Sequence, residues 1–564
     1  MRGAYATKVE LLCPCEEVSF FKLRDRLWKG EKCQPNPLHR FFTLMRKMKA
    51  RSYVTEDLAL NAELIAEREM ASKRCNETVD IHRATRLTFF ASRPQPRDWS
   101  DTAALSDDHI LGYAVVVTLQ LPQGLFRTFL LEAVIRRPTI SFETDADFVL
   151  IDVPNYYVHN SRQFGVTLGT PEQSREFTIP GTFFTQQNDL TSVCSHAALR
   201  MIVNSSSRLQ ESIRDVTGED KLTNKYINDV LGLDFGSPKK TIGHYEHDPK
   251  DADHKEGLTV EDMTKVVESL GVRFSVIDFR ERLSVDYDEL MYPMVESLNP
   301  TILEVQGWDM EKNEEYAHAL AVMGHTLNSD RWEPEANIGY GNYPQREYIP
   351  VCQWICHYVI SDDNYGMNMT LPSDTIRNHI VPHENPTAHA VRTMSIVPKE
   401  VTITGYASQK VAVDIANEHI KKTVLSREIY WLEKLKDKAR KKNIVCRTVL
   451  VSGGTYGAYI RSLVESQGLE LDQGQMEFLD TWPKYVWVTE ITLPNLYVGN
   501  KTKLGDVVVD ACASTAAITE RECVVFTWFP GFMRRGIQPP SEYWDLTTHV
   551  PLIRCGSRHP LIEW

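Results

Sequence analysis

Residues 183–203, FFTQQNDLTSVCSHAALRMIV, contain the segment around which the rest of the chain is interpreted. A polar loop with two glutamines leads through Thr191 and Ser192, which favour a helix N-terminus, into a predicted helix with Cys194 in its first turn. The residues three, four, seven and eight positions after the cysteine are apolar, which places the thiol on the buried face of this helix. We therefore expect a packed helix that begins with one thiol.

A thiol in this position can become reactive. The unpaired backbone N–H groups and aligned peptide dipoles at a helix N-terminus stabilise a thiolate, and a neighbouring imidazolium stabilises it further. A free cysteine is, however, often only a small buried hydrophobic residue. Interpreting Cys194 as a nucleophile therefore requires a base elsewhere in the chain.

Two later segments offer a base and a carboxylate. Residues 316–325, YAHALAVMGH, alternate as a β-strand does, with His318 on the face opposite the small alanines. Residues 357–366, HYVISDDNYG, begin as a strand that ends in Asp362 and Asp363. A carboxylate just past a neighbouring strand can accept the imidazole N–H and fix its tautomer, as a general base requires.

Two other histidines are predicted to be structural. His196 follows Cys194 by two residues and so faces away from it around the helix. His325 lies on the opposite strand face from His318. Neither is expected to act as the base.

A glutamine, a helix-opening cysteine, a strand of pattern His-Ala-x-x-x-x-Gly and a strand ending in Asp follow one another in this chain. This order resembles the papain-like cysteine peptidases, most closely the bacterial branch that processes bacteriocin leader peptides. The resemblance covers about 176–370. It implies an α+β fold with two lobes, in which a helical half carries the nucleophile and a β half carries the base and the carboxylate.

The resemblance also implies roles for individual residues. Cys194 would be the nucleophile, His318 the general base and acid, and Asp362 the orienting carboxylate. Asp363 is the alternative for the last role.

The resemblance further implies an amide side chain that stabilises the oxyanion. The family's glutamine usually stands one position nearer the cysteine than Gln187, at the place that Asn188 occupies. We choose Gln187 and keep Asn188 as the alternative. The chain departs from the family twice, with Ser195 in place of the usual glycine and with a long insertion at 328–353.

The composition of the chain indicates which binding partners and which cellular compartment to expect. The chain has 564 residues, 76 acidic against 63 basic, and a net charge of −13, so no nucleic acid and no membrane surface is expected as a partner. It contains no long apolar stretch and no signal-like N-terminus. Eleven scattered cysteines are typical of reduced thiols, and we expect a cytoplasmic protein.

The chain is expected to have accessory regions on both sides of the peptidase-like part. The β-rich region contains ILGYAVVVTLQLP and LFRTFLLEAVIRRP, joined at a Pro-Gln-Gly turn, and then DFVLIDVP. It would form either a separate accessory sheet or walls beside the cleft. The predicted regions are a helical or mixed N-terminal region (1–100), the β-rich unit (105–175), the papain-like domain (176–370) and a mixed α/β C-terminal domain (375–564).

No metal or cofactor is predicted. On the strand expected at 352–357, Cys352 and Cys356 point the same way while His357 points opposite, so these three are not expected to hold a metal. The histidine-rich segment 244–257 could also be drawn as a set of ligands, but it lacks the fixed spacing of a metal site. The cysteines within 13–15 also lack it. The segment 452–465, SGGTYGAYIRSLVE, lacks the spacing of a phosphate-binding loop.

The leading hypothesis is a cysteine hydrolase that cleaves a peptide or amide bond in a peptide or protein substrate through a thioester acyl-enzyme. The alternatives are a deamidase or acyltransferase effector with the same triad, autoinhibited or not, and a non-catalytic papain-like scaffold. The accessory regions could bind a protein partner. The basic helix predicted at 426–442 is interpreted as a solvated face, with an interaction surface as its alternative.

Overall fold

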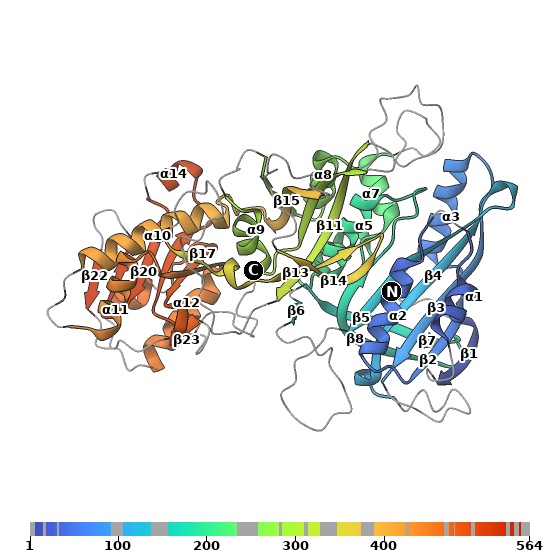
Figure 1. Cartoon of the computed structure of the whole chain (residues 1–564), viewed down its shortest axis with the longest axis horizontal. Coiled ribbons are helices and arrows are strands. Elements are labelled where there is room, and N and C mark those ends of the chain that lie inside the picture. Colours follow the sequence, from blue (N-terminus) through green and yellow to red (C-terminus); the bar gives the residue numbers. More distant parts are fainter. Residues whose placement is uncertain are drawn as a thin grey trace. The chain divides into compact units, whose positions relative to one another are not determined.

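The loop that precedes Cys194 leaves the end of a long antiparallel sheet in a computed structural model of the chain. The sheet has the order β1-β2-β3-β4-β5-β8-β7, and its strands carry the blue to green-blue colours of Figure 1. The predicted hairpin around the Pro-Gln-Gly turn is confirmed as β4 and β5, whereas the third predicted strand, 147–154, lies outside the described residues. The strands are β1 (Ala6–Pro14), β2 (Ser52–Leu58), β3 (Asp80–Phe90), β4 (Ile110–Gln120), β5 (Phe126–Arg136), β7 (Arg162–Gly169) and β8 (Ser174–Phe184).

Both faces of this sheet are buried by aromatic side chains. Phe89 stacks on Tyr53 and meets the edges of Phe41 and Phe42, which come from a helix on one face. On the other face, Phe90 contacts Phe177 in a cluster of buried apolar residues that extends along β7 and β8. The helices of the N-terminal part are α1 (Phe20–Leu27), α2 (Asn36–Lys47) and α3 (Ala62–Cys75).

The cysteine helix begins at Cys194 and is α5 (Cys194–Ser205). Its N-cap is Val193, with no side-chain capping bond, so the expectation that Thr191 or Ser192 caps it is wrong. The Thr191 hydroxyl instead donates to Glu67 of α3, and the Ser192 hydroxyl donates to Asn188 inside the preceding loop. Three more helices follow α5 in the chain, namely α6 (Gln210–Thr217), α7 (Asn224–Leu231) and α8 (Val260–Ser269).

The predicted His and Asp strands are confirmed as neighbours in a second sheet. In it, β11 (Glu314–Thr326) pairs antiparallel with β13 (His357–Asp362) on one side and with β10 (Thr301–Asp309) on the other. β14 (Gly366–Pro372) continues the sheet beyond β13, and the short β6 (Tyr156–Val158) pairs with β11. The register places Val305 opposite His318.

The chain divides into two compact units, and this division differs from the four predicted regions. The first unit contains 1–274, 300–325 and 358–371, and the second contains 275–299, 326–357 and 372–564. The N-terminal helices and the long sheet therefore belong to the same unit as Cys194, because buried polar contacts connect α3 to α5.

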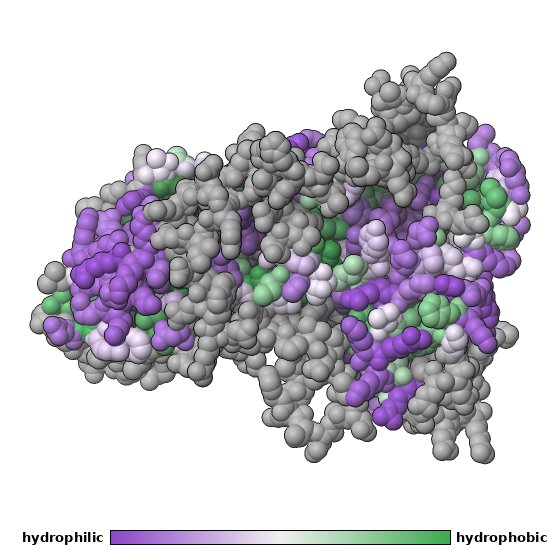
Figure 2. Space-filling view, in the orientation of Figure 1, coloured by the Kyte–Doolittle hydropathy of each residue, from purple (hydrophilic) through white to green (hydrophobic). Residues whose placement is uncertain are grey.

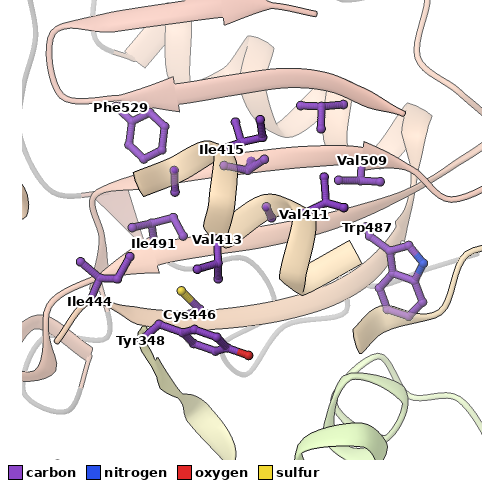
Figure 3. Packing of buried hydrophobic residues seen from close by; sticks show 14 of the residues in the cluster. Tyr348, Val411, Val413, Ile415, Ile444, Cys446, Trp487, Ile491, Val509 and Phe529 are labelled. Carbon is purple, nitrogen blue, oxygen red and sulfur yellow. The ribbon is translucent and has the colours of Figure 1, made fainter. Parts of the chain in front are cut away.

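The second unit is built on another mainly antiparallel sheet, of order β12-β16-β17-β19-β20-β21-β22. Apolar residues of α10 and α11 pack on one face and those of α12 on the other (Figure 1). Figure 3 shows Val411, Val413 and Ile415 of α10 among strand residues that include Ile491 and Val509, all in one buried cluster. The elements are β12 (Ile349–Pro350), α10 (Gly405–Lys422), α11 (Tyr430–Arg440), β16 (Val445–Ser452), α12 (Gly453–Ser466), β17 (Tyr485–Thr492), β19 (Gly505–Asp510), β20 (Val524–Phe529), β21 (Phe532–Arg535) and β22 (Glu542–Asp545).

The remaining elements complete the assignment of the described residues. They are β9 (Val272–Asp278), α9 (Tyr287–Glu296), η5 (Val351–Trp354), β15 (Ala388–Pro398), α13 (Gln473–Phe478), β18 (Thr502–Lys503), α14 (Thr515–Thr519), β23 (Leu552–Ile553) and the turns η2 (Asp107–His109) and η3 (Pro122–Gly124). The structure describes residues 6–14, 19–30, 33–91, 105–136, 156–158, 160–233, 258–280, 285–309, 314–326, 347–373, 388–423, 425, 428–466, 473–478, 480–497, 502–519, 521–536, 542–545 and 552–553.

Helix α11 is the basic helix predicted from the sequence. Lys436 forms an ion pair with Glu433 one turn away, and Lys441 at the C-cap forms one with Asp437. Figure 2 shows a mostly hydrophilic surface in the region of α10 and α11. These local pairs agree with the interpretation of a solvated face. Within the described residues, no helix is long and apolar enough to cross a membrane.

The segments considered as metal ligands differ in whether the structure describes them. The histidine-rich segment 244–257 and the N-terminal cysteine side chains lie outside the described residues, as does most of the 328–353 insertion. Cys352 was expected on a strand but lies buried in the 3-10 turn η5 instead, because the chain turns there before β13 begins. Cys356 is exposed.

Candidate active site

Three elements of the first unit bring together the residues predicted for the triad. Cys194 is the first residue of α5 and is partly exposed, His318 lies on β11, and Asp362 is the last residue of β13. His318 Nε2 lies 3.1 Å from Asp362 Oδ1 and donates a hydrogen bond to it. The Cys194 thiol lies close enough to the same imidazole to help raise the pKa of His318. The structure therefore brings the three side chains together, with a hydrogen bond between the imidazole and Asp362.

The electrostatic setting favours a protonated imidazole. Burial by itself would lower the pKa of His318, but hydrogen bonds with Asp362 and Cys194 and the charge of Asp363 hold this pKa well above 6.5. His318 is then able to hold the proton that the Cys194 thiol releases when it becomes a thiolate.

Asp363, the alternative carboxylate, also lies at the imidazole but makes no hydrogen bond with it. Its Oδ1 is 3.6 Å from His318 Nε2, and the side chain is fully buried. Neither oxygen of this carboxylate has a hydrogen-bond partner among the described residues. Burial raises the pKa of Asp363 to about 7, against the lowering effect of His318. Asp362 is therefore the carboxylate that orients the imidazole.

The same three residues are also the one group in the described part of the chain whose donor atoms could converge on a metal ion. One ligand atom each from His318, Asp362 and Asp363 can be chosen so that all lie within 4.8 Å of one another. An imidazole nitrogen with two carboxylates suits a divalent transition metal.

The two amides considered for the oxyanion differ in what they already bind. Asn188 is fully buried, its Oδ1 accepts backbone N–H groups of its own loop, and its Nδ2 donates to Thr191 and Glu67. Both hydrogens of the Asn188 amide are therefore already engaged, which favours Gln187 as the oxyanion donor. Gln187 donates through Nε2 to Asn364 Oδ1 at 3.3 Å, and Asn364 N–H in turn donates to Asp362 Oδ1. Gln187 is thus the amide that faces the Asp turn, and its Nε2 has a second hydrogen.

The loop before Cys194 is held by an acidic residue of α3. Glu67 Oε2 accepts hydrogen bonds from the Thr191 hydroxyl at 2.6 Å and from Asn188 Nδ2 at 3.2 Å. Its other oxygen accepts from Asn224 Nδ2 of α7 at 2.8 Å. Burial raises the pKa of Glu67, although the bond from Thr191 opposes the shift.

A second acid of α3 anchors the cysteine helix itself. Glu63 forms one ion pair with the Arg200 guanidinium of α5 and another with the Lys221 ammonium, each at 2.7 Å. Burial alone would raise the pKa of Glu63, but these two cations lower it below its usual value. The Arg200–Glu63 ion pair is buried and fixes α5 against α3.

The hairpin that carries the two aspartates is fastened to α2. Arg40 Nε donates to the Met367 carbonyl at 3.0 Å and its Nη2 donates to that of Asn368. Gly366 has φ +125, and a Cβ there would lie 2.5 Å from Arg40 Cβ. This close approach explains why a glycine follows the aspartate turn.

The residues predicted to be structural have structural partners. His196 is fully buried and donates from Nε2 to Asn228 Oδ1, and burial lowers its pKa to about 4. His325 is buried against Tyr358. Ser195, which replaces the family's glycine, accepts the Leu258 N–H with its hydroxyl and is buried.

Sequence analysis did not find the residues that support the site from the N-terminal part. Glu63 and Glu67 are four residues apart on one face of α3. Two acids at this spacing can be read from the sequence, but neither their burial nor their partners can. Nothing in the sequence around Arg40 predicts its contact with the aspartate hairpin.

The comparisons add no family to this geometry. No protein-family model matches the chain, and a search of curated proteins finds no match. The arrangement of Cys194, His318 and Asp362 is therefore interpreted from its own chemistry.

Proposed function

We propose that the chain is a cysteine hydrolase of papain-like type that cleaves a peptide or amide bond. One observation carries the proposal, namely the convergence of the Cys194 thiol on an imidazole, that of His318, which is hydrogen-bonded to Asp362. Three elements far apart in the sequence supply it, and the nucleophile lies at a helix N-terminus. This is the geometric signature of an activated thiol.

The reaction follows from the groups present. The thiolate of Cys194 attacks the carbonyl carbon, and the oxygen of that carbonyl becomes an oxyanion. His318 donates its proton to the leaving amine as the C–N bond breaks, which leaves a thioester. Water then attacks the thioester while His318 accepts the water proton, and the acid product leaves as the thiol is restored. Asp362 keeps the ring in the required tautomer throughout.

The oxyanion would be stabilised by the backbone N–H of Cys194 and by the Gln187 amide. The helix has no side-chain cap, so no cap competes for the N–H groups of its first turn. Each such donor is worth about 3–4 kcal/mol of the barrier. The link from Gln187 to Asn364 restricts the amide to the side of the site where the aspartates lie.

The substrate is proposed to be a peptide or protein, and the thiol chemistry suits a reducing compartment such as the cytoplasm. Every cysteine that the structure describes is a free thiol. A deamidase or an acyltransferase would use the same triad, with a side-chain amide or a second amine in place of the backbone amide or water. A non-catalytic scaffold would not need the thiol contact to the imidazole.

The products of the reaction identify the class of enzyme. Purified protein is incubated with a peptide library and with amine acceptors, and products are identified by mass spectrometry. Hydrolysis gives two shorter peptides, deamidation converts an amide into an acid, and acyl transfer joins two substrates. We expect cleavage by the wild type and none by Cys194→Ala or His318→Ala. Cys356→Ala, which removes an exposed thiol of the second unit, serves as the matched control. Equal product formation by Cys194→Ala would contradict the proposal.

A further inference from the structure

We propose that His318, Asp362 and Asp363 form a binding site for a divalent transition-metal ion, and that the bound ion switches off the thiol chemistry. Binding follows from these three side chains alone. The inhibitory consequence rests on the proposed function.

The separations of the donor atoms fit one ion. Metal bonds to imidazole nitrogen and carboxylate oxygen are about 2.0–2.2 Å long, so neighbouring ligand atoms around one ion lie about 3–3.6 Å apart. His318 Nε2 lies 3.1 Å from Asp362 Oδ1 and 3.6 Å from Asp363 Oδ1. Small side-chain rotations would place all three on a common ion.

The surroundings of Asp363 are a second, independent observation that points to a bound metal ion. This carboxylate is fully buried and has no hydrogen-bond partner for either oxygen among the described residues, although it directly faces the imidazole. Leaving a buried polar group without a partner destabilises the fold, and more so for a charged group. The hydrogen-bonded triad needs Asp362 alone, so it gives no reason for the second acid. A metal ion would satisfy both carboxylates.

The ligand set predicts which metals bind. One nitrogen and two carboxylates favour Zn²⁺, Co²⁺ or Mn²⁺, whereas Mg²⁺ and Ca²⁺ prefer sites made of oxygen alone. We expect Zn²⁺ to bind more tightly than Mg²⁺ or Ca²⁺. The partly exposed Cys194 is not required as a ligand.

A bound metal ion would prevent His318 from acting as the general base. Because Nε2 is the nitrogen at Asp362, the other ring nitrogen, Nδ1, is left for the thiol of Cys194. An ion bound at Nε2 displaces the Nε2 proton to solvent, and the neutral ring then keeps its remaining proton on Nδ1. Nδ1 can no longer accept the thiol proton, and no imidazolium is available to protonate a leaving amine.

Metal binding is measured first, with ZnCl₂ in competition with a chromophoric chelator. We expect wild type and Cys194→Ala to bind one equivalent with similar affinity, and Asp363→Asn to lose at least tenfold. Asp189→Asn is the matched control, because Asp189 adds negative charge near Asp363 without being a ligand, and it should stay within threefold of wild type. Binding that survives in Asp363→Asn but is lost in Cys194→Ala would overturn the proposal.

If Asp363→Asn does not fold, Asp362→Asn removes another ligand, and X-ray absorption of the Zn²⁺-loaded wild type reports the ligand atoms directly. A shell that contains nitrogen and carboxylate oxygen supports the site, and a shell of sulfur without carboxylate oxygen contradicts the site. Inhibition is measured as haloacetamide labelling of Cys194, which Zn²⁺ should slow at least tenfold in wild type and less than twofold in Asp363→Asn. Fast labelling without zinc binding rejects the metal site alone, whereas zinc binding without thiol activation supports the site and rejects the hydrolase.

Discussion

Glu67 accepts a 2.6 Å hydrogen bond from the hydroxyl of Thr191, a residue 124 positions later in the chain. This contact fixes the loop that enters the cysteine helix, and the same carboxylate also holds Asn188 and Asn224. The position of the Cys194 thiol therefore depends on a helix near the N-terminus.

Replacing Glu67 by alanine should release this loop. We expect the free energy of unfolding in urea to fall by about 2–3 kcal/mol, because buried donors lose their acceptor. Labelling of Cys194 should slow at least tenfold. Glu67→Gln keeps one acceptor oxygen and should lose less on both measures. Glu69→Ala, at an exposed position of the same helix, should behave as wild type. Equal losses in the two alanine variants would show that Glu67 has no special role.

Gly366→Ala tests the attachment of the aspartate hairpin to α2. The new Cβ would lie 2.5 Å from Arg40 Cβ at φ +125, so we expect a loss of about 3 kcal/mol in stability, together with slower labelling of Cys194. The comparison is Gly218→Ala, which has φ +68 and open space around its Cβ and should lose only about 1 kcal/mol. If both variants lose the same amount, the contact with Arg40 does not matter.

His196 should make stability depend on pH. Its pKa is about 4 in the folded protein and about 6.5 when unfolded, so the unfolded chain binds more protons between these values and stability falls as the pH is lowered through this window. The loss reaches about 2 kcal/mol at pH 5. Urea unfolding at pH 7.5 and pH 5 measures it, and His196→Gln should lack this part of the change. An identical pH dependence in both proteins would refute the prediction.

The second unit contains a buried network in which Lys503 contacts Asp506 at 2.7 Å and Glu490 at 3.3 Å. Lys503→Met would leave two buried carboxylates without this cation, at a cost of about 3–5 kcal/mol. Amides of β17 and β19 that exchange through global opening should then exchange about a hundredfold faster or more. Lys441→Met, which removes one exposed ion pair, should leave these rates unchanged. Unaltered exchange in the Lys503 variant would mean that the network contributes little.

The sequence was sufficient for features that depend on local pattern. The helix at Cys194 and the strands of His318 and Asp362 follow from apolar periodicity, which reports the period of each element directly. The choice between Gln187 and Asn188 did not follow from spacing. Asn188 is occupied by the backbone of its own turn, in which Asp189 adopts a left-handed φ of 55°.

Contacts between distant segments could not be predicted in the same way. Glu67 and Arg40 act on loops far along the chain, and no periodicity records a tertiary partner. For the same reason the N-terminal region was separated from the peptidase-like part, although both belong to one compact unit.

The rate at which haloacetamide labels Cys194 tests the central claim most directly. Peptide mapping at pH 6 compares this cysteine with the other cysteines in wild type, His318→Ala, Asp362→Asn and Cys356→Ala. We predict that Cys194 reacts at least tenfold faster than any other cysteine, that the His318 variant loses this advantage and the Asp362 variant loses much of it, and that Cys356→Ala changes nothing. If Cys194 reacts no faster than exposed Cys356, and the His318 variant is unaltered, the thiol is not activated and the chain is not a cysteine hydrolase of this kind.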